Sequence, residues 1–287
     1  MKSNIFEITN LIIVMTKKYF CILSFFLFGI LSSNAQSNAF LKHIDKLEFA
    51  KAEKKLSKKY EKEKDDIELN YAYAKLYNSK EYKGYNPYKA NDYIVIAIKV
   101  LNDLGNEEKV KYSKKGYTIE SLSKIKEECY NLAYNDCKDK NTIDCFKNYI
   151  LYFTNAPEWK IKAQRAIYDI AFNIAEKINT LDSYQKFIND FNSLKLIDNY
   201  FQADDLLKSA WSNVYVLEFA NSKDINSIRS YQEYIDKYPK SHLLNDAVSL
   251  RNKLAFSEAI RINTIDSYQY FINKYPEAVE KKEAIQK

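Results

Sequence analysis

The cysteines are the residues whose chemistry depends most on their spacing. Cys129, Cys137 and Cys145 follow one another at intervals of eight residues, whereas Cys21 lies far upstream. Zinc sites use ligand pairs two to four residues apart, so this spacing does not predict one. On one helix, Cys129 and Cys137 would lie about 12 Å apart along the axis, too far to bond. A disulfide between Cys137 and Cys145 across a helix turn remains open in an oxidising compartment.

Other residues that commonly perform catalysis are few or lack a partner. His43 and His242 lie far apart in charged sequence, and a chain with two histidines cannot form a three-histidine metal site. There is no G-x-S-x-G, Walker, H-E-x-x-H or C-x-x-C motif. Asp182 and Asp266 are better explained as helix starts, where the helix dipole favours negative charge. We therefore predict that the protein is not an enzyme and has no cofactor or metal site.

Aromatic side chains offer a different chemistry, which is stacking against a ligand. The sequence has 25 tyrosines, 16 phenylalanines and two tryptophans, Trp159 and Trp211. We expect most of them in the core, because aromatic side chains bury a large apolar area. A tryptophan exposed on a groove wall would instead suit glycan or peptide binding, and the tyrosines between Tyr71 and Tyr93 could line such a groove.

The composition predicts that helices position these residues. The chain has 287 residues, 46% of them apolar and 29% charged, as in globular proteins. Four glycines and four prolines are too few for the turns of a β-sandwich or barrel, or for a phosphate-binding glycine loop. Helices joined by short polar connections fit this composition best.

Residues 1–35 have the pattern of a secretory signal peptide. Lys17 and Lys18 form a positive region, and the stretch from Phe20 to Leu31 is mostly apolar. Small residues follow, ending at Ala35. Twelve residues are too few to span a bilayer, which needs about 20, so cleavage is favoured over an uncleaved anchor.

Cleavage between Ala35 and Gln36, with translation starting at Met15, predicts an exported protein. We expect it in the periplasm or associated with the outer membrane, without an integral span after cleavage. No cysteine follows the apolar stretch, so a lipid anchor is not predicted. The net charge of +6 is carried by interleaved lysines and acids, as in residues 51–66, which does not predict a nucleic-acid surface.

Four segments of the sequence match one another at many positions. They cover residues 141–153, 179–191, 226–239 and 263–276, and each begins with asparagine. The intervals between these asparagines are 38, 47 and 37 residues. A period near 37 with one insertion of about ten residues indicates a repeat protein, because self-similarity at a fixed period marks such architectures.

Each repeated column has a physical reason. The second residue is Thr or Ser, whose hydroxyl caps a helix start. Apolar residues follow at positions 2, 5, 8, 9 and 12 after the asparagine, which is the spacing of one helix face. Pro239 and Pro276 then stop the helix. The residues of this face that we assign to the repeat structure are Tyr184, Phe187 and Ile188; Tyr231, Tyr234 and Ile235; and Tyr268, Phe271 and Ile272.

A second helix is predicted before each copy. Residues 166–178 and 247–262 carry alanine at four-residue steps, which allows close helix approach. One repeat is therefore an antiparallel helix pair, and stacked pairs form an all-α solenoid with a period of about 37 residues. Both cysteines occupy columns of small residues, so packing explains them without redox chemistry: Cys145 aligns with Ser183, Ser230 and Ser267, and Cys137 with Ala175 and Ala259.

The organisation predicted for the mature chain has three parts. Residues 36–105 form an N-terminal helical region of the same kind in a less regular form. Residues 106–117 are charged, follow Gly105, and are predicted to be a linker. Residues 118–287 contain the regular repeats.

The alanine-rich helix followed by a helix of the form Y-x-x-F-I-x-x-Y-P resembles tetratricopeptide (TPR) repeats, loosely over 40–104 and more closely over 118–287. It is distantly similar to the TPR lipoprotein of the outer-membrane β-barrel assembly machine. The chain departs from the family in its longer period and in lacking the Trp and Gly of the first TPR helix and a lipidation motif. The resemblance implies an exported, non-enzymatic scaffold that binds another envelope protein. The alternative is a glycan- or nutrient-binding module acting beside an outer-membrane transporter.

Overall fold

The computed structural model describes residues 39–197 and 203–287, and every regular element in these ranges is helical. The predicted all-α class is therefore confirmed. The predicted signal peptide, with Met15, Ala35 and Gln36, lies outside the described residues. The chain divides into two compact units, residues 1–133 and 134–287, which we describe separately.

The N-terminal unit contains the helices up to most of α7. They are α2 (Ala39–Asp45), α3 (Phe49–Tyr60), α4 (Ile67–Asn78), α5 (Pro87–Asp103), α6 (Asn106–Lys114) and α7 (Ile119–Lys140), the last of which crosses the boundary between the units. Helix α4 packs along α5, and Ile67, Ala74, Ile94 and Ala97 are buried in the cluster that they share. Side chains fix the starts of both helices, since Asp66 accepts a hydrogen bond from the Leu69 N–H and Asn86 from the Tyr88 N–H.

The predicted linker, residues 106–117, contains a helix. Helix α6 covers Asn106–Lys114 and has acids in its first turn and lysines in its last turn. This charge order complements the helix dipole, so the charged composition that suggested a linker also favours a helix. Gly116, at a φ of 89°, then provides the left-handed turn into α7. The boundary between the compact units lies further along, between Ala133 and Tyr134.

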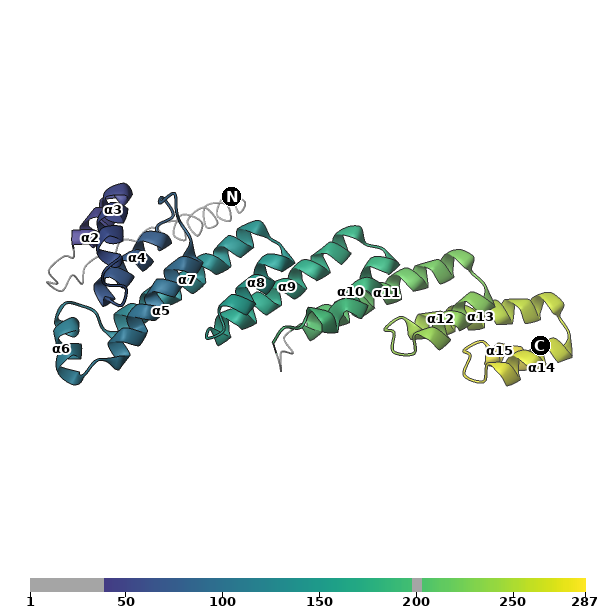
Figure 1. Ribbon diagram of the computed structural model, residues 1–287. Helices are drawn as coiled ribbons and strands as arrows, with labels where there is room; N and C mark the ends of the chain where they lie inside the picture. Colours follow the sequence, from purple (N-terminus) through teal and green to yellow (C-terminus); the bar gives the residue numbers. More distant parts are fainter. Residues whose placement is uncertain (1–38, 198–202) are drawn as a thin grey trace, which may run out of the picture. The chain divides into compact units, whose positions relative to one another are not determined.

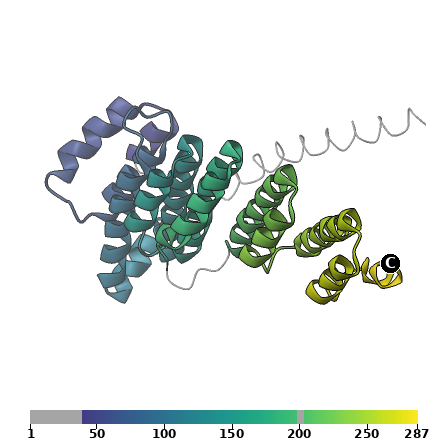
Figure 2. The same ribbon diagram turned by 90° about the vertical axis from the view of Figure 1, so that its right-hand side faces the viewer.

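The C-terminal unit is a series of helix pairs in sequence order (Figure 1). Its helices after α7 are α8 (Ile143–Tyr152), α9 (Pro157–Ile178), α10 (Leu181–Asp190), α11 (Asp204–Ile225), α12 (Ile228–Lys237), α13 (Leu244–Ile262), α14 (Ile265–Lys274) and α15 (Lys281–Gln286), with a 3₁₀ turn η1 at Phe191–Leu194. From α8 onward each α-helix packs against the next along the chain. Figure 2 shows the same helices following one another in sequence order, from teal to yellow. The longer helix of each pair thus lies between two shorter ones, as in a solenoid.

The packing in the C-terminal unit follows the repeated columns. Ala163, Ala210 and Ala247 occur sixteen residues before successive repeat asparagines, and all three are fully buried. The aromatic residues of the predicted repeat face are buried, whereas its isoleucines at 188, 235 and 272 are half-buried. Small side chains on the long helix and aromatic rings on the short helix therefore fill the interior of each pair.

The ten-residue insertion falls between α10 and α11, where η1 begins the connection. The Gln164 side chain of α9 binds the first part of this connection. The side-chain N–H of Gln164 donates to the Leu194 carbonyl at 2.8 Å, and the side-chain oxygen accepts from the Leu196 N–H at 2.7 Å. Gln164 is fully buried, so these two bonds satisfy a polar group that would otherwise be costly to bury.

Candidate interaction surface

Each helix pair turns at the asparagine that begins the repeat. Asn141, Asn179, Asn226 and Asn263 have φ values of 49°, 52°, 47° and 52°, in the left-handed region. Asparagine tolerates this region better than most residues, and it commonly ends helices there. Each asparagine N–H donates to the carbonyl four residues earlier, at 2.8 to 2.9 Å. The repeated asparagine is therefore a helix terminator, a role that its position after each long helix could have indicated.

Side chains fix the short helix that follows the turn. In the second copy, Thr180 Oγ1 accepts from the Ser183 N–H at 3.2 Å, and Ser183 Oγ accepts from the Thr180 N–H at 3.1 Å. Ser183 Oγ also donates to the Ala175 carbonyl at 2.9 Å, and the Tyr184 hydroxyl donates to Asn179 Oδ1 at 3.1 Å. The same set of bonds recurs in the third and fourth copies.

The first copy uses a covalent bond at this place. Cys137 and Cys145 form a disulfide, with their Cα atoms 5.3 Å apart. In the other copies, a hydrogen bond from a serine hydroxyl to a backbone carbonyl connects the same two columns, as between Ser183 and Ala175. The explanation of both cysteines by packing alone is therefore wrong, and the disulfide that the sequence left open is present. The sequence indicates this bond, because the two columns that hold small residues in the other copies both hold cysteine in the first copy.

An apolar groove opens between α13 and α14. Its volume is about 430 Å³, within the range of about 300 to 1,000 Å³ that is common for binding pockets. Ala255, Ala259 and Phe271 belong to its lining and are buried, whereas Ile262, also in the lining, is 48% exposed. Ile228, from the first turn of α12 in the preceding pair, also lines the groove. Asp266, Lys274 and Glu258 add charges to it.

Smaller grooves occur at the same columns of two other pairs. The groove between α9 and α10 is about 170 Å³ and includes Ile143 from the preceding pair, in the column of Ile228. The groove between α11 and α12 is about 130 Å³. There Glu218 replaces the alanine found at residues 171 and 255, and its Oε1 accepts from Lys237 Nζ and the Tyr238 hydroxyl, both at 2.8 Å. The sequence does not predict these grooves, because their volumes depend on side-chain packing.

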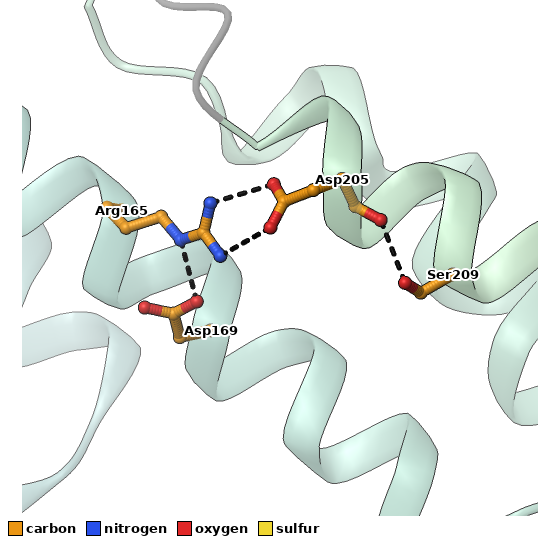
Figure 3. A network of polar contacts seen from close by, with 4 residues as sticks. All are labelled: Arg165, Asp169, Asp205 and Ser209. Atoms are coloured by element: carbon orange, nitrogen blue, oxygen red, sulfur yellow. Dashed lines mark hydrogen bonds and ion pairs between the residues drawn. The ribbon is translucent and has the colours of Figure 1, made fainter.

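An ion-pair network connects α9 to α11 (Figure 3). The Arg165 guanidinium donates two hydrogen bonds of 2.8 Å to the Asp205 carboxylate, and its Nε donates to Asp169 at 2.8 Å. These bonds raise the pKa of Arg165 and lower the pKa of Asp205. The two parallel hydrogen bonds fix the orientation of the Asp205 carboxylate relative to the Arg165 guanidinium, so they position the start of α11 after the insertion.

The two tryptophans are less buried than expected. Trp159 is half-buried against Tyr134, with ring centroids 5.5 Å apart. Trp211 is 38% exposed and stacks on Tyr215 at 5.9 Å. His242 is exposed beside Tyr215. In the N-terminal unit, half-buried His43 has its Nδ1 2.6 Å from a Glu48 carboxylate oxygen and its Nε2 2.8 Å from Lys55 Nζ.

Tyrosines of the N-terminal unit form a stacked cluster rather than a groove. The rings of Tyr73 and Tyr93 are stacked at 4.6 Å, and those of Tyr77 and Tyr93 at 5.7 Å. Tyr60 meets Tyr73 and Tyr93 edge-on. Burial raises the pKa of Tyr93 to about 12 and also raises that of Tyr73, because the charged phenolate is disfavoured away from water.

The described ranges contain no group of three or more His, Cys, Asp or Glu side chains placed to hold a metal ion. Within the same part of the chain, no helix combines the length and apolar character needed to cross a membrane. Comparisons with models of protein families and with curated proteins gave no match to this sequence.

Proposed function

We propose that this protein is an exported, non-enzymatic interaction scaffold of the cell envelope, and that its C-terminal unit binds another envelope protein in the groove between α13 and α14. The observation that carries the proposal is the groove itself, an apolar hollow of about 430 Å³ whose lining includes the exposed side chain of Ile262. Its backbone is preorganised by the capping bonds of Thr264 and Ser267, so binding a partner orders little of the chain.

The chemistry of the groove favours an aliphatic side chain presented by a helix. Within the chain, Ile228 and Ile143 each lie in the first turn of a short helix and contribute to the groove of the next pair. A partner segment that presents a similar side chain would extend this contact. Acidic and basic side chains both line the groove, which fits a protein segment better than a nucleic acid.

Two features support an exported protein. The first is the signal-peptide pattern, and the second is the disulfide between Cys137 and Cys145, because such bonds persist in oxidising compartments and are rare in the cytosol. The TPR-like arrangement of helix pairs is compatible with a relation to envelope modules such as the assembly-machine lipoprotein, which stays a prediction from the resemblance.

The test is crosslinking in the native cells, followed by purification under denaturing conditions. Ile262 and Ile260 lie on the same helix and are 48% and 44% exposed, but only Ile262 belongs to the groove lining. We expect one stoichiometric envelope protein with the wild type and with Ile260→Glu, and its loss with Ile262→Glu. Recovery of the same partner from all three would move the binding site elsewhere, and no protein partner at all would contradict the proposal.

A second candidate function is glycan or nutrient binding beside an outer-membrane transporter. The observation that favours it is the exposure of Trp211, stacked on Tyr215, since aromatic faces of this kind suit sugar rings. Tryptophan fluorescence that shifts on adding oligosaccharides, and that no longer shifts in Trp211→Phe, would support this candidate. An unchanged spectrum would remove it.

A further inference from the structure

The two cysteines of the disulfide differ in burial and in their place on a helix. Cys137 is in the last turn of α7 and is fully buried. Cys145 is in the first turn of α8 and is half-buried, and its N–H donates to Thr142 Oγ1 at 3.3 Å. A reagent from the solvent therefore reaches residue 145 more easily than residue 137.

The helix dipole and the burial of the two residues favour the same order. The first turn of a helix carries free N–H groups and favours a negative charge, so it stabilises a thiolate at residue 145. Burial disfavours a thiolate at residue 137, because a charged sulfur away from water loses its solvation. The reactive form of a cysteine is the thiolate, so both accessibility and charge make Cys145 the better nucleophile in the reduced chain.

We propose that the Cys137–Cys145 pair is a site of thiol–disulfide exchange with an external disulfide oxidant, in which Cys145 reacts first and Cys137 resolves the intermediate. The Cys145 thiolate attacks one sulfur of the oxidant, whose S–S bond breaks and releases a thiolate. Cys137 then loses its proton and attacks Cys145 Sγ in the mixed disulfide, which releases the second thiolate of the oxidant. Two protein thiols are oxidised, and one external disulfide is reduced to two thiols.

The free cysteine of the described residues is excluded from this exchange. Cys129 is fully buried, and the Asn78 side chain donates to its sulfur at 3.3 Å. Burial raises the pKa of its thiol to about 12, so it carries almost no thiolate at neutral pH. The exchange therefore selects one pair from the three neighbouring cysteines, and it goes beyond the proposed scaffold role because it concerns how the chain acquires its covalent bond.

The repeats supply matched variants for a test. Cys137→Ala introduces the residue found at Ala175 and Ala259, and Cys145→Ser introduces the residue found at Ser183 and Ser267, so both substitutions reproduce side chains that pack at these columns. The full-length chain and both variants would be reduced, mixed with glutathione disulfide, quenched with acid, alkylated and mapped by mass spectrometry cysteine by cysteine. Circular dichroism would establish that each is folded.

We expect Cys137→Ala to accumulate a glutathione adduct at Cys145, and Cys145→Ser to form an adduct at Cys137 at least about tenfold more slowly. Equal rates, or a faster reaction at Cys137, would overturn the order. The wild type gives an independent check that needs no variant, since an early quench should find the mixed disulfide on Cys145 and a late one the internal disulfide. An early adduct on Cys137, or a failure of the pair to close, would contradict the proposal.

Discussion

The Tyr231 hydroxyl donates a hydrogen bond of 3.1 Å to Asn226 Oδ1, the side chain of the residue whose left-handed backbone ends α11. One bond thus connects the aromatic face of the short helix to the turn that reverses the chain. The equivalent bonds of Tyr184 and Tyr268 are 3.1 and 3.0 Å. In the first copy Phe146 takes this column, so the ring fits without the hydroxyl, and a disulfide secures the turn.

Tyr231→Phe should therefore lower the free energy of unfolding by about 0.5–1.5 kcal/mol, the usual contribution of one hydrogen bond. Tyr231→Ala should cost about 3–5 kcal/mol, because it also removes a buried ring. Urea unfolding measures both values. Tyr270→Phe, at a well-exposed position of α14, is the control and should change stability by less than about 0.5 kcal/mol. Equal stability of Tyr231→Ala and the wild type would place this column outside the core.

The helix pairs could be predicted from the sequence because their signals are local. The hydroxyl cap at residue 180, the aromatic spacing from Tyr184 and the stop before Pro239 each depend on a few neighbouring residues. The groove between α13 and α14 could not be predicted in this way. Its volume depends on how Ile228 of one pair meets Ala255 and Phe271 of the next, which is a matter of packing between repeats.

Asp205→Asn should weaken the start of α11, because it removes the charge that pairs with Arg165. The carboxylate is largely exposed and solvent screens the pair, so we expect a loss of about 1 kcal/mol or less at neutral pH. The lowered pKa of Asp205 means that this contribution is present above the pKa of the unfolded chain and is lost as the pH falls through the folded value.

The measurement is thermal unfolding of Asp205→Asn and of a control variant at neutral and acidic pH and at low and high salt. Asp204→Asn is the matched control, since Asp204 lies in the same first turn of α11 and feels the same helix dipole. The difference between the two variants should shrink in acid and in high salt. A difference that is unaffected by both conditions would show that Asp205 acts through something other than its ion pair.

The tyrosine cluster predicts instability in alkali. Burial raises the pKa values of Tyr60, Tyr73, Tyr77 and Tyr93, with that of Tyr93 at about 12. The unfolded chain loses such protons near pH 10, so between about pH 10 and 12 it binds fewer protons than the folded chain. Stability should therefore be present below pH 10 and fall as the pH rises through this window.

Spectrophotometric titration of tyrosinate, followed together with circular dichroism, would test this expectation. We expect a group of tyrosines in the folded protein to ionise only as the helices unfold, and the same group to titrate near pH 10 in urea. Complete ionisation of all tyrosines in the folded protein near pH 10 would show that the cluster is open to solvent.

The most direct test of the scaffold proposal places a photoreactive side chain at Tyr270, an exposed residue that lines the groove between α13 and α14. The control carries the same group at Ser257, which is exposed on α13 outside the groove lining. After irradiation of the native cells, we expect one predominant protein adduct from residue 270 and none from residue 257. The absence of a protein adduct at residue 270, or the same adducts at both positions, would contradict the proposal.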